Sequence, residues 1–137
     1  MSAPRESGQS AVELAILLPV LLLIALGCLD LGRAFAVRMA LANGAREGAH
    51  YASMFPLAPA GRGSLTAICQ ETERDITAQG LSASSLRVVP SAPEGWLGGK
   101  PVKVTASYTL PMLTSYLFGG QPLIIRASSQ MIIIGGY

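Results

Sequence analysis

Charged and aromatic side chains are scarce in this chain: of its 137 residues, 13% are charged and 6% are aromatic, with a single Trp. Soluble domains usually carry about a quarter charged residues, so the composition indicates a segment that is not surrounded by water. Ten basic and eight acidic residues give a net charge of +2. This balance provides no basic stripe for a phosphate backbone, and we expect no nucleic-acid partner.

Residues that carry catalysis or bind metals are equally scarce. The one histidine, His50, follows Glu47 by three residues in an Ala-rich stretch, and no Gly-rich phosphate loop or zinc-type cysteine pair occurs. A lone histidine without a nucleophile motif is a poor basis for a catalytic centre or a metal site, so His50 is interpreted as an exposed or interfacial helix residue. We expect no enzyme activity, catalytic residue, metal, cofactor or small-molecule substrate.

Cys28 lies inside an apolar run, and Cys69 lies far outside it. This separation excludes a disulfide framework. We interpret both as small apolar residues, with an intermolecular bridge through Cys69 as the alternative.

The apolar residues are concentrated near the N-terminus, where residues 14–29 contain no formal charge. A helix over residues 11–29 spans roughly 28 Å, close to the hydrocarbon thickness of a bilayer. Pro19 interrupts the run, but membrane helices tolerate proline, and a slight kink is expected there. We predict a transmembrane helix over residues 9–29.

The helix is predicted to continue beyond the membrane over residues 30–54, which are Ala-rich and free of proline. Gly44 and Gly48 oppose this prediction, at about 1 kcal/mol each relative to Ala. Four alanines at helical spacing form a shallow stripe for close packing: Ala42, Ala45, Ala49 and Ala52. The sequence thus favours one long helix from about residue 9 to residue 54.

A linker and a second helix follow. Residues 55–63 contain Pro56, Pro59, Gly61 and Gly63, which is typical of a linker. Residues 64–79 have helical periodicity and are followed by Gly80 as a stop signal. The predicted apolar face of this helix consists of Leu65, Ile68, Cys69, Thr72 and Ile76, with Glu71 and Asp75 opposite.

Beyond the second helix the period changes to two. Apolar and polar residues alternate over residues 102–110, the clearest strand pattern in the chain, and a short strand is expected at Leu86 and Val88. A third strand is expected over residues 123–134, after a loop rich in Pro and Gly. Gly98 and Gly99 mark the turn region between the first two strands.

The predicted fold class is α+β: a long N-terminal helix, one amphipathic helix and a small antiparallel three-stranded β-meander. Four parts are expected: a leader over residues 1–8, the transmembrane helix over 9–29, its continuation over 30–54 and a small globular domain over 55–137. The core of a domain this small is thin, and we expect it to pack on the long helix or on neighbouring subunits.

The most informative segment is residues 8–13, Gly-Gln-Ser-Ala-Val-Glu, just before the apolar run. A carboxylate carried to the bilayer centre costs about 2.5–3.5 kcal/mol. Glu13 is compatible with a position at the headgroups, where the helix macrodipole favours an anion. If the chain is cut after Gly8, the new α-amino group of Gln9 can pair with Glu13 within one chain or between two, and an inter-chain pair would fix the stagger of neighbouring helices.

The N-terminal third resembles the TadE-like pseudopilins of the tight-adherence (Tad) type IV-like pilus system, densely over residues 8–53. The residues that carry this resemblance are Gly8, Glu13, Pro19, Gly27, Asp30, Gly32, Arg33 and the stretch Ala45-Arg46-Glu47-Gly48-Ala49. It implies that a prepilin peptidase cuts between Gly8 and Gln9 and that the product joins or primes the pilus, where the pairing of Glu13 described above would serve assembly and register. It further implies an adhesive pilus whose partners are other pilin subunits, the assembly machinery and membrane lipid.

The resemblance also implies a single-pass protein of the bacterial inner membrane, with the N-terminus cytoplasmic and the C-terminal domain outside. Arg5 is the one basic residue before the apolar run, whereas Arg33, Arg38 and Arg46 follow it. The positive-inside rule alone would keep the C-terminal side in the cytoplasm. We follow the motif because it is far more specific than a count of three arginines.

Two other envelope proteins remain as alternatives. Residues 25–28, Ala-Leu-Gly-Cys, approximate a lipobox, which would make the chain a lipoprotein with an unknown binding role. A secretory signal cut after Ala36 is the second alternative, although Asp30 and Arg33 lie between the apolar core and that site.

Overall fold

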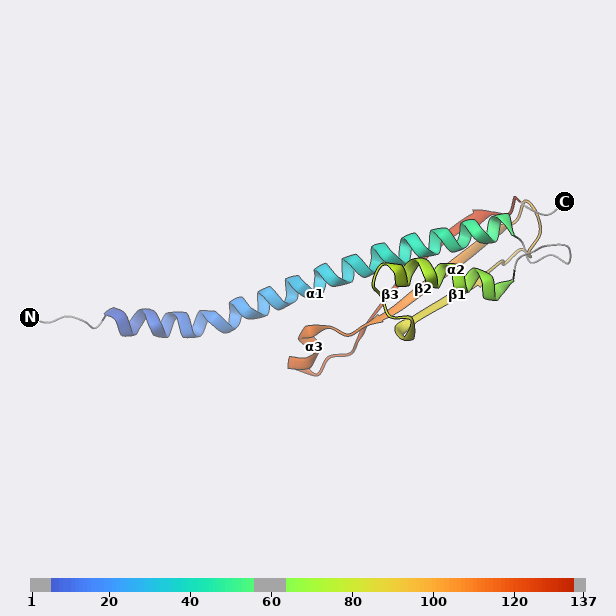
Figure 1. The fold of residues 1–137 in the computed structure, drawn as a ribbon. Coiled ribbons are helices and arrows are strands. Elements are labelled where there is room, and N and C mark those ends of the chain that lie inside the picture. The colour runs from blue at the N-terminus through green and yellow to red at the C-terminus, as the bar shows by residue number, and fades with distance from the viewer. Residues whose placement is uncertain (1–5, 56–63, 135–137) are drawn as a thin grey trace, which may run out of the picture.

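The structure, a computed structural model, describes residues 6–55 and 64–134. In chain order it contains α1 (Glu6–Met54), α2 (Leu65–Ala78), a short 3₁₀ turn (Ala83–Ser85), β1 (Leu86–Ser91), β2 (Pro101–Leu110), α3 (Leu113–Phe118) and β3 (Leu123–Ile132). The N-terminal half of α1 projects away from all other elements, and its C-terminal half lies along α2 and the sheet (Figure 1). The predicted α+β class is confirmed.

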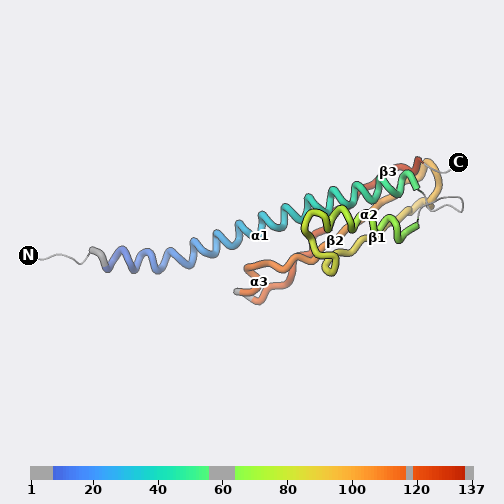
Figure 2. The backbone as a smooth tube through the Cα atoms, in the orientation of Figure 1, coloured from blue at the N-terminus to red at the C-terminus, as the bar shows by residue number. Residues whose placement is uncertain are grey.

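Helix α1 is a single unbroken helix of 49 residues that contains Pro19. It ends at Met54, as predicted, and begins at Glu6, three residues before the expected start. Its axis changes direction within the apolar half (Figure 2), where the sequence predicts a kink at Pro19. The predicted linker over residues 55–63 lies, after Phe55, outside the described residues.

Helix α2 begins and ends within one residue of its predicted bounds, 64 and 79. Ser64 is its N-cap, with the hydroxyl accepting a hydrogen bond from the Ala67 N–H at 3.0 Å. Gln79 is the C-cap, and Gly80 follows with a φ of +88°, which favours glycine. The buried face consists of Ile68, Thr72 and Ile76. Leu65, the first residue of the helix and predicted on that face, is instead half exposed.

The three strands form an antiparallel sheet in the order β1-β2-β3. On β2 the alternation predicts the buried face correctly: Val102, Val104, Ala106 and Leu110 are buried. β3 ends at Ile132, two residues before the predicted end. Ile132 pairs with Pro101, the first residue of β2. Beyond it the Ile133 N–H donates to the carbonyl of Lys100, and the Ile134 N–H donates to the carbonyl of Ser53 at the end of α1.

The connection between β2 and β3 was predicted as a loop, but it contains the six-residue helix α3. This is a correction to the predicted count of two helices. A helix this short has no room for a 3.6-residue pattern. Gly119, with a φ of +65°, ends it.

The core lies between the C-terminal half of α1, helix α2 and the sheet. One buried cluster contains Val37, Leu41, Ala45, Ile76, Ala106, Leu110 and Ile125, and the other contains Ala49, Ala52, Ile68, Val102, Val104 and Ile133. The globular domain therefore packs on the long helix, as expected.

The helix face in this core is not quite the predicted alanine stripe. Ala45, Ala49 and Ala52 are buried as predicted, but Ala42 is exposed and Gly44 and Gly48 are buried. A Cβ at Gly44 would overlap Ile76, and one at Gly48 would overlap the Thr72 hydroxyl. Glycine has a low helix propensity, but these two glycines are the positions at which α2 can approach α1 closely.

Candidate functional site

Most of the apolar half of α1 is not covered by the other described residues. Its large side chains are about half exposed: Val12, Leu14, Ile16, Leu17, Leu18, Val20, Leu21, Leu22, Leu23, Ile24 and Leu29. Within residues 6–55 and 64–134, α1 is the one helix long and apolar enough to cross a membrane. Such a surface in a monomeric soluble protein marks an interaction site, so this half is built for lipid or for other apolar helices.

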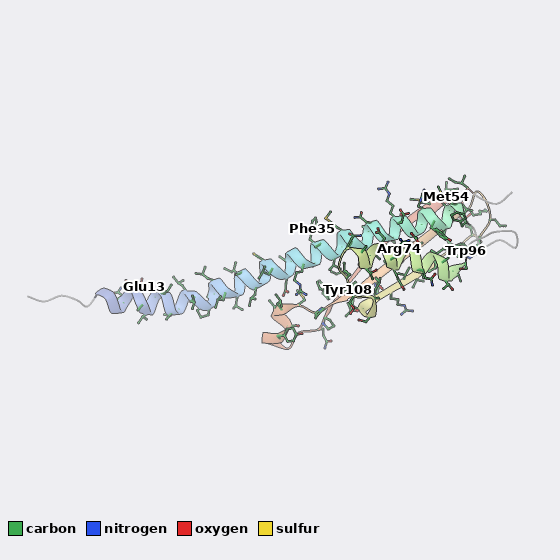
Figure 3. The ribbon with its side chains drawn as sticks, in the orientation of Figure 1. Glu13, Phe35, Met54, Arg74, Trp96 and Tyr108 are labelled. Atoms are coloured by element: carbon green, nitrogen blue, oxygen red, sulfur yellow. The ribbon has the colours of Figure 1, made fainter. Side chains whose placement is uncertain are left out.

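The three predicted processing and assembly residues lie at the start of this half. Gly8, Gln9 and Glu13 are all in α1 and all exposed. The Gln9 side-chain amide donates to Oε1 of Glu13 at 3.2 Å, so the two residues share one face, one helical turn apart. Figure 3 places Glu13 near the free end of α1, far from the sheet. The structure thus brings Gln9 and Glu13 together and leaves Gly8 accessible, while their roles remain predictions.

Asp30, one residue beyond the apolar run, holds the domain against α1. Its side chain is only 1% exposed. Oδ1 accepts from the Leu113 N–H at 2.8 Å, and Oδ2 accepts from the N–H of Thr114 at 2.9 Å and from its hydroxyl at 2.8 Å. The carboxylate therefore satisfies the first N–H groups of α3, which no residue within α3 can do.

Hydrogen bonding controls the protonation of this carboxyl. The hydrogen bond from the Thr114 N–H holds the pKa of Asp30 below its usual value, and burial opposes this shift. The Leu113 N–H, the Thr114 hydroxyl and Arg33 also lower the pKa. Asp30 is thus an anion at neutral pH. Sequence reasoning included Asp30 in the family resemblance but assigned it no contact. The sequence feature that points to a role for Asp30 is its position as the first charged residue after the apolar run.

Arg33 completes this contact. Its Nη1 lies 3.6 Å from Oδ1 of Asp30 and donates to the carbonyl of Pro111 at 3.3 Å. Its side chain is 42% exposed, so the ion pair is partly screened by solvent. Arg33 nevertheless connects α1 to the end of β2 at the same level as Asp30.

A hollow opens beside this contact, between α1 and the start of β3. It is lined by Leu31, Ala34, Phe35, Arg38, Leu123, Ile124, Ile125 and Arg126. Four of these are large apolar side chains with exposed surface, namely Leu31, Phe35, Leu123 and Ile124. The hollow thus combines an apolar lining with two cationic side chains.

The one histidine and the two cysteines lie apart from the contact at Asp30. His50 is exposed and lines a shallow hollow with Asn43, Arg46, Glu47, Asp75 and Met131. No three His, Cys, Asp or Glu side chains among the described residues are placed to hold a metal ion. Both cysteines are free thiols, and burial, with the charge of Glu73, raises the pKa of Cys69. A protonated thiol is a weak nucleophile.

The model of the family described as TadE-like protein matches residues 8–50. This is the family that the sequence resembles, so that prediction is confirmed over this stretch. The match begins at Gly8 and runs through the apolar half of α1, Asp30 and both buried glycines. No curated protein and no solved structure matches the chain. Together with a helix able to span a membrane, the match indicates a membrane protein related to the Tad pilus.

Proposed function

We propose that this chain, TadE-like over residues 8–50, is a membrane-anchored pseudopilin or minor pilin subunit that supports assembly of a Tad-type adhesive pilus. The observation that carries the proposal is the form of α1 within the matched stretch. One half is an apolar helix exposed on all sides, and the other is the support on which a small domain folds. A subunit of a helical filament needs both, since its apolar helix stays in the membrane until other subunits cover it.

Processing is the first part of this proposal. A prepilin peptidase would cut between Gly8 and Gln9, which lie in the freely projecting part of α1. The secreted alternative is less compatible with the fold, because a cut after Ala36 would remove Asp30 and Arg33 and leave the start of α3 without its acceptor.

The mature N-terminus distinguishes these cases. N-terminal sequencing of the membrane-extracted protein should begin at Gln9, and Gly8→Val should leave the leader attached because the peptidase site is lost. A lipid-bearing start at Cys28 would instead establish the lipoprotein. A start after Ala36 would establish a secreted protein.

The proposed topology places the domain outside the cytoplasm. Three arginines follow the apolar run and oppose this orientation by the positive-inside rule, but the matched family motif is more specific than that count. A C-terminal alkaline phosphatase fusion, which is active only outside the cytoplasm, should be active. An inactive phosphatase fusion together with a fluorescent cytoplasmic reporter would contradict this orientation.

Glu13 is proposed to mark the register between subunits. In the uncut chain its carboxylate already accepts a hydrogen bond from the side chain of residue 9. Cutting after Gly8 would place a charged amine on that same residue. In the apolar environment between packed helices, this amine needs an anion, and Glu13 of the same or of a neighbouring chain would supply it.

The Glu13→Ala variant tests this pairing in a strain that lacks the native copy. The variant should be made, cut and inserted, because residues 14–29 are unchanged, yet it should support few or no pili in electron micrographs. Glu94→Ala, which removes a carboxylate from an exposed loop, is the matched control and should leave piliation normal. Normal piliation by Glu13→Ala would refute the pairing.

A further inference from the structure

We propose that the end of the domain nearest the apolar half of α1 binds the bilayer surface, so that the chain contacts lipid a second time beside its anchor. We call this end the anchor-side surface and define it by Leu31, Phe35, Arg38, Tyr116, Leu123, Ile124 and Arg126. The inference rests on the membrane anchor of the proposed function and is independent of any role in a pilus. Its partner is a phospholipid headgroup layer that contains anionic lipid.

The fold fixes the level of this surface relative to the anchor. Asp30 directly follows the last apolar residue of the predicted span, and it binds Leu113 and Thr114 at 2.8 to 2.9 Å. The start of α3 is therefore held where α1 leaves the hydrocarbon. In Figure 1, α3 is the part of the domain that reaches furthest along α1 toward its apolar half.

The distances along α1 match the thickness of the headgroup layer. This layer adds roughly 5–8 Å on each side of the hydrocarbon core. Leu31 is one residue beyond Asp30 and Phe35 is five, which is about 8 Å along a helix. Both side chains thus fall within the headgroup layer, and they line the same hollow as Leu123 and Ile124 of β3.

The exposed side chains suit such a layer better than water. Tyr116 on α3 is 81% exposed, and Leu31, Phe35 and Ile124 are each more than half exposed. Tyrosine is enriched at membrane interfaces, where its ring is apolar and its hydroxyl remains hydrated. Apolar side chains in such a patch stabilise interfacial binding in proportion to the area that lipid covers.

The charges at this end are complementary to anionic lipid. Asp30 is buried and paired, and the chain contains no Asp or Glu after Glu94. Arg38 and Arg126 line the hollow and are exposed, and Arg33, five residues before Arg38 on α1, adds a third cation nearer the span. A second copy of the chain is the less favoured occupant, because lipid is already present at this level and carries the opposite charge.

Tryptophan fluorescence in vesicles with acyl-brominated lipid tests the proposal on the full chain. The native Trp96 is a control, since it lies at the end of the molecule opposite the apolar half of α1 (Figure 3). In a Trp96→Phe background, Leu21→Trp reports on the anchor and Tyr116→Trp on the anchor-side surface. We expect both new tryptophans to lose fluorescence to the brominated lipid and to emit at shorter wavelength, whereas Trp96 should not respond.

The three probes separate the possible failures. Quenching of Leu21→Trp with none of Tyr116→Trp would overturn this inference and leave the anchor intact. Absence of quenching at both positions would overturn the anchor as well. Quenching of Tyr116→Trp that follows the protein-to-lipid ratio would assign the surface to a second copy and would also overturn the proposal.

The charge dependence provides the second measurement. In vesicles of phosphatidylcholine with phosphatidylglycerol, Arg38→Gln with Arg126→Gln should reduce the quenching of Tyr116→Trp and leave that of Leu21→Trp unchanged. In phosphatidylcholine alone, the same two substitutions should have little effect. An equal response in both lipids would contradict the part of the proposal that assigns anionic lipid as the partner.

Discussion

The two halves of α1 are one continuous helix with opposite chemistry. The N-terminal half presents large, exposed aliphatic side chains, and most of its length is not covered by any other described element. The C-terminal half presents glycine and alanine on one face, and α2 and the sheet cover that face. Side-chain size differs between the two halves for a physical reason. Close packing of one helix on another requires small side chains at the contact, whereas a helix in lipid is stabilised by large apolar side chains.

The comparison teaches that helix propensity alone is a poor guide to what stabilises each half. Gly44 and Gly48 lower the intrinsic stability of the helix, by about 1 kcal/mol each. In return they allow Ile76 and Thr72 of α2 to pack directly against the backbone of α1. Most helix stability in proteins comes from such tertiary packing. A glycine should therefore have opposite effects on stability where α2 covers α1 and where no other element lies close to it.

Truncation of a leucine in each half should give the largest contrast. Leu41 is fully buried in the domain core, so Leu41→Ala should lower the free energy of unfolding of the domain by about 2–5 kcal/mol. Leu21→Ala, in the exposed half, should leave it unchanged. Urea unfolding of the detergent-solubilised chain, followed by Trp96 fluorescence, measures both. Equal losses would show that the halves are not energetically separate.

Addition of one methyl group to a glycine in α1 should give effects of opposite sign. Gly48→Ala would place a Cβ on the Thr72 hydroxyl and should destabilise the domain by about 1–3 kcal/mol. Gly32→Ala meets no atom within 4 Å and should stabilise the helix by about 0.5–1 kcal/mol. The same unfolding assay applies. Stabilisation by Gly48→Ala would refute the close approach of α2.

Acidification should release the start of α3 from Asp30, at the boundary between the two halves of α1. Of the three changes, this one should have the smallest effect on the free energy of unfolding. The folded-state pKa of Asp30 lies below its unfolded value near 4. The contribution of the carboxylate is therefore complete above pH 4 and is lost as the pH falls through the folded-state pKa. The amide NMR shifts of Leu113 and Thr114 should change in that range.

Asp30→Asn is the matched variant for this titration. Asn retains one acceptor oxygen and has no charge to titrate. Its Leu113 and Thr114 amide shifts should not vary over the same pH range. Identical titrations in the two proteins would assign the change to another group.

Long periodic segments could be predicted from the sequence, because each carries its own local signal. The uncharged run over residues 14–29 predicts an apolar helix, the pattern after Ser64 predicts α2, and alternation on β2 predicts its buried face. The linker, the leader and the processing site remain predictions. The recognised family is confirmed by the match over residues 8–50.

Contacts between distant residues could not be predicted from local pattern. Asp30 and Thr114 are 84 positions apart, and nothing in either segment indicates the other. Alanine spacing places Ala42 on the packed face with the three alanines that are buried there, but Ala42 is exposed and Gly44 and Gly48 lie on that face. Backbone-to-backbone approach depends on the absence of a side chain, and a hydrophobicity pattern does not register that absence.

The unbroken course of α1 through Asp30 has a consequence for how copies of the chain encounter one another. A domain on a flexible tether samples many heights and orientations above a membrane, and association must remove that freedom. Here no hinge separates the proposed anchor from the domain, so every anchored copy holds its domain at one height. Encounters are then confined to movement within the membrane plane and rotation about the helix axis, which lowers the entropic cost of ordered assembly before any contact between subunits forms.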